Sequence, residues 1–171
     1  RRQMKTYFDA IVIGAGPAGV SCASALSGFG LEVLLLDEQP RPGGQIYKNI
    51  ENVSGRRLEI LGEDYAAGQK LVNRFRRCKL DYVPGAAVWQ VEPDGHVYFS
   101  CDGASHEAFA KFVVAATGAM ERPVPFPGWT LPGVMGAGGA GNLIKDAGLI
   151  PRGKVILAGS GPLLFLEAVH L

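Results

Sequence analysis

Cysteine, histidine and net charge are all scarce in this chain of 171 residues. Its three cysteines lie far apart, at positions 22, 78 and 101, and its three histidines show no metal-ligand spacing. An odd number of isolated thiols makes no disulfide framework, and none has the short spacing of a zinc site. The formal net charge of +1 gives no electrostatic reason to bind nucleic acid or an anionic membrane. We therefore expect no structural disulfide, no metal and no nucleic-acid partner.

An unbroken hydrophobic run long enough to cross a membrane is also lacking. Residues 10–31 carry no charge, but Pro17 and five glycines interrupt them. A membrane helix needs about 20 consecutive apolar residues, so we expect no span. The opening Arg1–Arg2 pair is followed by a predicted strand and by no small-residue cleavage site, which favours a cytoplasmic location. Because the chain starts on arginine and stops within the apolar pattern FLEAVHL, we expect a fragment of a longer protein.

Glycine, by contrast, is abundant, with 24 residues, and its most informative cluster lies near the N-terminus. Residues 8–13 form an apolar, β-branched run that predicts a buried strand. Pro17 suits the first turn of a helix that we expect to reach about residue 29. Residues 33–36 predict a second buried strand. The intervening sequence, Gly14-Ala-Gly16-Pro-Ala-Gly19, is the turn of a strand–turn–helix–strand unit that binds dinucleotides.

Each glycine of this turn has its own physical task. Gly14 permits the sharp strand-to-helix turn, Gly16 lets a pyrophosphate approach the backbone, and Gly19 lets the helix pack closely on the strand. The first helical turn, which includes Pro17 and Ala18, then offers free N–H groups and the positive end of the helix dipole to the phosphates. We therefore expect a dinucleotide across this turn.

An acid follows at the end of the second predicted strand. Asp37 lies 23 positions after Gly14, the spacing at which a carboxylate accepts hydrogen bonds from the ribose, and Glu38 is the alternative beside it. An acid there favours a free 2′-hydroxyl over a 2′-phosphate. FAD and NAD both meet that requirement, and the turn alone does not separate them.

The rest of the chain predicts a loop over residues 38–60, an amphipathic helix over 63–78 and a connecting segment rich in proline and glycine after residue 122. Four short β-rich segments between residues 81 and 114 predict an antiparallel meander that returns to a buried strand over 112–115. A short helix is expected over 141–147, and another buried strand over 154–158. The strand is followed by a second glycine turn, Gly159-Ser-Gly161.

Taken together, the motifs IGAGPAG, LLLDEQPRPGGQIY and VVAATGAMERPVPFPGW resemble the pyridine nucleotide–disulfide oxidoreductase superfamily, whose members have two dinucleotide domains. The resemblance implies that the first glycine turn binds FAD and that the second turn binds NAD(P)H. It also implies that Ala116-Thr117-Gly118 lies against the flavin nucleotide and that the Val88 backbone holds the adenine. Candidate FAD-binding residues are Gly14, Gly16, Pro17, Ala18, Gly19, Asp37, Glu38, Arg41, Gly44, Gln45, Val88, Ala116, Thr117 and Gly118.

This resemblance gives the expected fold class and domains. The fold is α/β, a Rossmann-like FAD-binding sheet with a small antiparallel β-meander, followed by the truncated start of a second Rossmann-like unit. Residues 1–122 form the FAD-binding domain, with the meander at about 81–111. Residues 123–152 form a connector, and 153–171 begin the NAD(P)-type unit.

A closer resemblance is to the FAD/NAD-binding subunits of opine oxidase, hydrogen cyanide synthase and D-hydroxyproline dehydrogenase. It rests on the stretches DEQPRPGGQIY, ATGAMERPVPFPGWTLPGVMGAGGAGNLIK and LAGSGPLL. It implies an FAD-dependent oxidoreductase subunit that passes electrons in a complex dehydrogenating an amino or imino acid. The implied partners are a substrate subunit of the D-amino-acid-oxidase type and a small iron–sulfur protein.

The sequence departs from the superfamily in two places. It has no CxxC or CxxxxC motif at the expected positions, which excludes disulfide reductase chemistry. Leu164 replaces the third glycine of the second turn, which weakens the NAD(P)H site at Gly159 and Gly161. Two alternatives stay open, a stand-alone NAD(P)H-dependent flavoprotein reductase without redox cysteines and a non-catalytic nucleotide-binding subunit. The sequence identifies no catalytic side chain, as expected where a flavin carries the chemistry.

Overall fold

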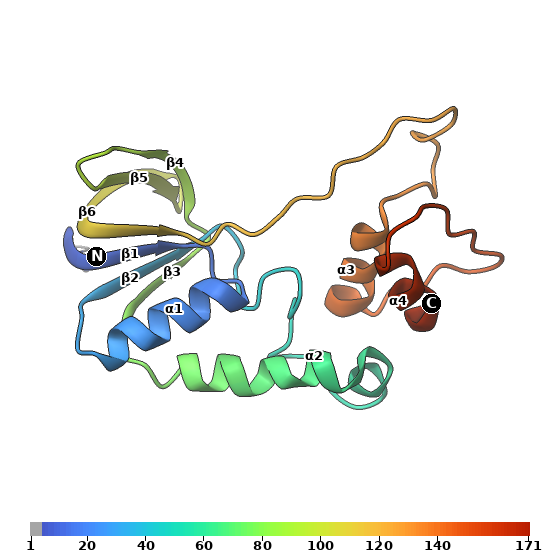
Figure 1. Cartoon of the computed structure of the whole chain (residues 1–171), viewed down its shortest axis with the longest axis horizontal. Coiled ribbons are helices and arrows are strands. Elements are labelled where there is room, and N and C mark those ends of the chain that lie inside the picture. Colours follow the sequence, from blue (N-terminus) through green and yellow to red (C-terminus); the bar gives the residue numbers. More distant parts are fainter. Residues whose placement is uncertain (1–4) are drawn as a thin grey trace.

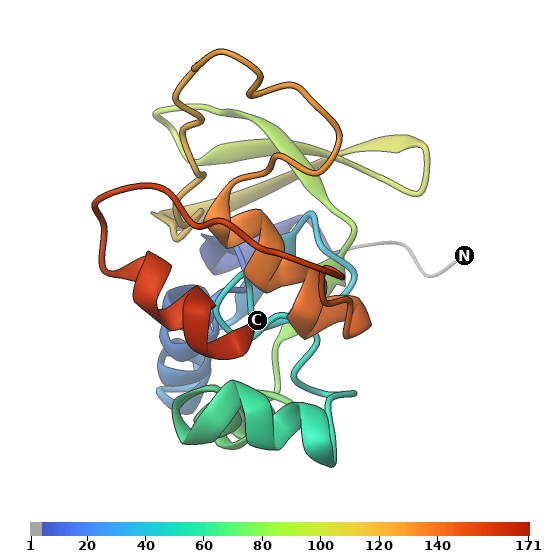
Figure 2. The same cartoon turned by 90° about the vertical axis from the view of Figure 1, so that its right-hand side faces the viewer.

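The computed structural model describes residues 5–171, which form one mixed sheet with helices on one side and a separate helix pair beyond it (Figure 1). The strands are β1 (Tyr7–Ile13), β2 (Val33–Asp37), β3 (Asp81–Pro84), β4 (Ala87–Val91), β5 (His96–Cys101) and β6 (Ala104–Ala115). The helices are α1 (Pro17–Gly28), α2 (Arg56–Phe75), α3 (Ala137–Ala147) and α4 (Leu163–His170). An extended segment after β6 leads to α3 and α4, which lie side by side in both views (Figure 2).

The six strands are ordered β3-β2-β1-β6-β5-β4, and they pair in two ways. β1 pairs parallel with both β2 and β6, and β2 pairs parallel with β3. β5 pairs antiparallel with β4 and β6. The long strand β6 thus belongs to the hairpin at its start and to the parallel sheet at its end. This arrangement confirms the expected α/β class, with a Rossmann-like parallel sheet carrying a small antiparallel extension.

The first segment of the predicted meander is assigned differently by the structure. β3 pairs parallel with β2, with Leu34 opposite Asp81 and Leu36 opposite Val83, so the expectation that it opens the antiparallel meander is wrong. The physical reason is the crossover through α2, which returns the chain to the edge of β2 in the parallel direction. The meander itself consists of β4, β5 and β6.

Two further segments expected to be buried strands are exposed. Phe112 lies within β6 as predicted, but 69% of its surface is accessible. Residues 154–158 form no strand at all, and Ile156 is 79% exposed. The local apolar pattern there is real, but a strand needs a neighbour to accept its backbone hydrogen bonds, and the sheet formed by the described residues ends at β3 and β4.

The helix predicted over residues 63–78 begins earlier and is bent. α2 starts at Arg56, and Gly62 interrupts it with non-helical backbone angles (φ 80°, ψ 178°). A positive φ of this size is one that glycine adopts without strain, so Gly62 joins two shorter helices. The predicted face is correct beyond this point, because Tyr65, Val72 and Phe75 are all buried.

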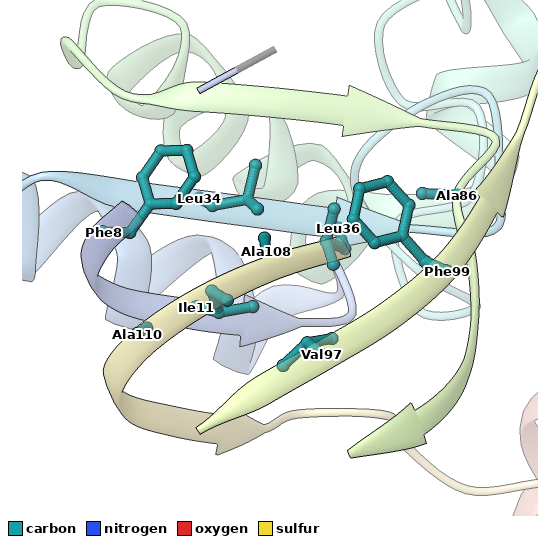
Figure 3. Close-up of a cluster of buried hydrophobic side chains, with 9 residues drawn as sticks. All are labelled: Phe8, Ile11, Leu34, Leu36, Ala86, Val97, Phe99, Ala108 and Ala110. Atoms are coloured by element: carbon teal, nitrogen blue, oxygen red, sulfur yellow. The ribbon is translucent and has the colours of Figure 1, made fainter. Parts of the chain in front are cut away.

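The core has three parts, which lie on the two faces of the sheet and under α2. The first lies between the hairpin and the parallel strands, where Phe8, Ile11, Leu34 and Phe99 meet (Figure 3). The second packs α1 onto the opposite face through residues such as Val12, Val20 and Leu35. The third, which we call the loop core, joins the loop after β2 to α2 and α3 and contains Ile50, Val53, Leu61, Tyr65, Val72 and Ile144. Among residues 5–171, none of the helices combines the length and the apolar character needed to span a bilayer.

Tyr65 makes the stability of the loop core sensitive to alkaline pH. Its hydroxyl donates to the Lys48 carbonyl oxygen at 2.6 Å, and burial raises the pKa of Tyr65 to about 12. The folded chain therefore keeps a proton that the unfolded chain loses near pH 10. We expect the free energy of unfolding to fall as pH rises from about 10 to about 12, because the unfolded state there binds fewer protons.

This contribution can be measured with Tyr65→Phe by urea unfolding at pH 8 and across the alkaline range. At pH 8 the variant should lose about 1 kcal/mol, because one buried hydrogen bond is removed. Its stability should then decline less steeply with pH than that of the parent chain. Tyr7→Phe is the matched control, since Tyr7 is 69% exposed. An equal alkaline decline in Tyr65→Phe and the parent chain would contradict this account.

Candidate functional site

The glycine turn lies at the carboxyl end of β1, where two of its glycines are fixed by close packing. The Gly14 N–H donates to the Leu36 carbonyl oxygen at 2.7 Å, and its φ of 103° suits only glycine. A Cβ on Gly14 would overlap the carbonyl oxygen of Ala116, and one on Gly19 would overlap the carbonyl oxygen of Gly14. These two glycines therefore hold the turn, the following helix and the end of β6 together.

Gly16 differs from both, because space lies beside it. It precedes the first residue of α1, with Pro17 in the first turn, and its backbone is extended (φ −69°, ψ −179°). A Cβ built there would have its nearest neighbour, the Gly44 Cα, at 3.9 Å, an ordinary contact distance. The fold therefore does not itself require glycine at this position. A ligand that approaches the backbone does require it, and the free N–H groups of the helix N-terminus would suit a diphosphate. The residues present thus fit the predicted cofactor.

The predicted glycine pair packs directly behind this turn. The Gly43 N–H donates to the Ala15 carbonyl oxygen at 2.8 Å. Gly44 has a φ of 60°, and a Cβ on it would lie 2.8 Å from the Gly16 Cα. Two glycine segments about 30 residues apart thus form one bare backbone surface.

Asp37 lies at the end of β2, as predicted, but its carboxylate faces the turn. One of its oxygens accepts a hydrogen bond from the Ala15 N–H, and the other accepts one from the Gln39 N–H at 2.6 Å. The residue is only 8% exposed, whereas the neighbouring Glu38 is exposed. Asp37 therefore stabilises the turn, and the contact of either acid with a ribose stays a prediction.

Residues from two other strands complete the same edge of the sheet. The Ala116 N–H donates to the Ile13 carbonyl oxygen at 2.8 Å, so that the exposed residues Thr117 and Gly118 follow directly beside the glycine turn. The Ala86 N–H donates to the Asp37 carbonyl oxygen at 2.8 Å. This bond places the start of β4, the strand that contains Val88, next to the predicted ribose site. The edge thus brings together the segments around positions 14, 37, 88 and 116.

The loop between β2 and α2 holds the last two candidates. Arg41 donates from Nη1 to Asn49 Oδ1 at 2.8 Å, at the rim of a small pocket of about 80 Å³. Asn49 in turn donates from Nδ2 to the Asp146 carbonyl oxygen at 2.8 Å. The pocket is lined by Gln39, Pro40, Arg41, Gly44, Lys48, Asn49 and Asp146.

Gln45 connects this loop to two distant segments. Its Nε2 donates to the Ala119 carbonyl oxygen at 3.5 Å, and its Oε1 accepts from Asn142 Nδ2 at 3.4 Å. Lys145 Nζ donates to its backbone carbonyl oxygen at 3.2 Å. Sequence reasoning missed Asn142 and Lys145, because they lie about 100 residues away and nothing in the stretch around them indicates a contact with Gln45.

The second glycine turn is filled by a side chain of its own chain. Gly159 and Gly161 are exposed and follow no strand. A Cβ on Gly159 would lie 2.7 Å from Leu164 Cδ1, so the leucine side chain occupies the space beside the turn. The weak phosphate site expected from Leu164 stays a prediction.

The part of the chain that the structure describes contains neither a pair of bonded cysteines nor a candidate metal site. All three cysteines are free, and in residues 5–171 there is no cluster of three or more His, Cys, Asp or Glu side chains able to hold a metal ion.

The amino-acid sequence is similar to those of known oxidoreductases. Residues 8–161 match the family model described as pyridine nucleotide-disulphide oxidoreductase. The chain is 45% identical over 165 residues to an opine oxidase subunit of Rhizobium meliloti, covering 96% of this chain and 36% of that protein. It is 39% identical over 166 residues to the hydrogen cyanide synthase subunit HcnB of Pseudomonas aeruginosa, covering 94% and 35%. The chain thus spans about a third of the length of these relatives.

A solved structure shares the fold. L-proline dehydrogenase from P. horikoshii superposes with a TM-score of 0.66 at 23% sequence identity, over 82% of this chain and 28% of that one. At this level of identity the likeness bears on the fold alone. The two chains thus share the arrangement of their strands and helices.

Proposed function

The chain belongs to the pyridine nucleotide-disulphide oxidoreductase family, and from this premise we propose that it is the FAD-binding part of an oxidoreductase subunit. The subunit would pass electrons within a complex that dehydrogenates an amino or imino acid of the opine, hydroxyproline or glycine type. Similarity to the opine oxidase subunit of R. meliloti and to HcnB supports this assignment.

One observation carries the proposal, the open space beside Gly16 between two tightly packed glycines. The fold itself accounts for Gly14 and Gly19, but it leaves room for a side chain at Gly16. A ligand on the backbone gives glycine a role there. The position, at a helix N-terminus and at the carboxyl ends of parallel strands, is where α/β folds bind dinucleotides.

The residues would divide the binding between them. The first N–H groups of α1 would donate to the diphosphate, and Glu38 or Asp37 would accept from the ribose hydroxyls. Arg41, on the loop beside Gly44, would offset part of the phosphate charge. When bound, FAD supplies the redox chemistry, accepting an electron pair from the substrate side and releasing electrons to an acceptor.

We extend the proposal to partner chains, because both relatives are named as subunits. By name, the opine oxidase protein and HcnB are each one part of a larger assembly. In this proposal the C–N bond would be oxidised on a partner chain. We propose a substrate subunit of the D-amino-acid-oxidase type and a small iron–sulfur subunit for these roles.

The test is to purify the intact protein with its native partners and to identify the cofactor released by denaturation. We expect FAD at about one molecule per chain, together with co-purifying subunits identified by mass spectrometry. Under anaerobic conditions, an amino or imino acid should bleach the flavin only when the partner chains are present. NADH or NADPH alone should leave it oxidised, because Leu164 fills the second turn.

Each contrary result identifies a different error. Absence of any flavin would overturn the cofactor assignment. Bleaching by NADH or NADPH without partners would make the protein a stand-alone reductase. A bound flavin that no substrate, partner or nicotinamide reduces would make it a non-catalytic nucleotide-binding subunit.

A further inference from the structure

Helix α3 contacts the loop that carries the glycine pair through two polar side chains. Lys145 Nζ lies 3.2 Å from the Gln45 carbonyl oxygen, and Asn142 Nδ2 lies 3.4 Å from Gln45 Oε1. These bonds hold both the backbone and the side chain of the residue that follows Gly44. A displacement of Gln45 would therefore displace Gly44, whose Cα packs against Gly16 in the predicted phosphate cradle.

The C-terminal end of the same helix is also bonded to the loop and to the start of α2. The Asp146 carbonyl oxygen accepts from Asn49 Nδ2 at 2.8 Å and from Arg57 Nη1 at 3.3 Å. Ile144 is buried in the loop core. The helix is thus docked rather than loosely adjacent, and Lys145 projects from a rigid support.

The charge of a buried acid on α4, Glu167, also acts on Lys145. Glu167 is 2% exposed, and its Oε2 has no hydrogen-bond partner within the described residues. Burial lowers the pKa of Lys145, and the negative charge of Glu167 opposes this effect. Burial raises the pKa of Glu167, and the charges of His170 and Lys145 oppose that shift. A buried carboxylate is costly unless a cation lies close by. Glu167 therefore helps to keep a charged lysine at this position.

We propose that Lys145 is a positioning residue for the cofactor site, holding the Gln45 carbonyl so that the glycine-pair loop keeps its place behind the phosphate cradle. Glu167 supports it from α4. The helix pair that follows the sheet thus sets the geometry of a site built on the sheet. This inference rests on the proposed function for its ligand, but the contact itself lies within this chain.

The experiment compares Lys145→Met and Lys145→Arg in the intact protein, with Lys70→Met as the control. Lys70 is an exposed residue of α2 and has no role in the site. Two readouts are taken, the FAD dissociation constant with the visible flavin spectrum, and amide hydrogen exchange in the flavin-free protein. The exchange of interest is at Tyr47 and Ile50, whose N–H groups bond within the loop at 3.0 and 3.1 Å.

We expect Lys145→Met to raise the FAD dissociation constant about tenfold, the effect of one lost charged hydrogen bond. The visible band should change shape, since the flavin environment shifts, and exchange in the loop should become about tenfold faster. Lys145→Arg should restore both readouts to within about twofold, because it retains a charged donor. Lys70→Met should match the parent protein in all of them.

The two readouts separate failure of this inference from failure of the proposed function. Loop exchange that is unchanged in Lys145→Met would overturn the positioning role, whatever the protein binds. A parent protein that binds no flavin would overturn the proposed function, while exchange would still decide the role of Lys145. Should Lys145→Met fail to fold, Asn142→Ala removes the second contact to Gln45 and replaces it in the same comparison.

Discussion

Replacing Gly16 with alanine should cost the protein its cofactor while leaving the fold intact. The added Cβ meets only the Gly44 Cα, at 3.9 Å, so the flavin-free chain accommodates it. The same methyl group would occupy the space through which a diphosphate reaches the backbone. We expect FAD affinity to fall by about a hundredfold, or about 2.7 kcal/mol. Flavin fluorescence quenching measures the affinity, and urea unfolding of the flavin-free protein measures the stability.

Gly28→Ala is the matched control for this change. Gly28 ends α1 on the far side from the turn, and a Cβ there meets no atom within 4 Å. The control should bind FAD as the parent does. If Gly16→Ala binds FAD as tightly as Gly28→Ala, the ligand does not lie on this turn and the proposed function loses its main support.

Gly19→Ala, unlike Gly16→Ala, should greatly reduce the stability of the chain in the absence of any ligand. Its Cβ would overlap the Gly14 carbonyl oxygen, a backbone atom that cannot rotate away. α1 would have to move off β1, which disturbs the packing of Val20 and Ala23 in the second core cluster. We expect a loss of about 3 kcal/mol, at the upper end of the usual cost of overpacking.

Thermal and urea unfolding of the flavin-free protein measure this loss. With a chain of this length, the melting temperature should fall by roughly 6 to 12 °C. Gly28→Ala again provides the comparison, since it makes the same chemical change at an uncrowded position of the same helix. Equal stability of the two alanine variants would show that α1 packs less closely on β1 than described.

The first strand, helix and strand of the fold could be predicted from sequence, because their signals are local. The buried runs, Pro17 and the spaced glycines of residues 8–37 specify a strand, a turn, a helix and a strand in order. β1, α1 and β2 begin and end within one residue of the predicted bounds. Each of these signals acts within a few residues of the structure it causes.

Segments whose structure depends on a distant neighbour were predicted less well. The residues of β3 show β character, but whether they pair parallel or antiparallel depends on the edge that α2 delivers them to. Residues 154–158 show the same character as β1, yet no strand lies beside them in the described chain. A strand is a property of a pair, and one sequence segment contains only half of that information.

The candidate site shows the same division. The positions of Gly14, Gly16, Gly19 and Gly44 follow from their sequence motifs, and the structure brings them together. The hydrogen bonds of Asp37 to Ala15 and Gln39 depend on the direction of one short side chain. The contacts of Gln45 with α3 depend on the return of the chain after about 100 residues. Neither leaves a sequence signal.

Strand β6 belongs both to the hairpin and to the parallel sheet, and this limits where the length of the hairpin can change. Its early residues pair with β5, its late residues pair with β1, and Ala116 follows directly, in contact with the glycine turn. Inserting one residue within the strand would reverse the side on which every later side chain points. We therefore expect related chains to differ in length at the hairpin tip, Asp102–Gly103, rather than along the strand, so that the tip can diverge while the cradle keeps its geometry.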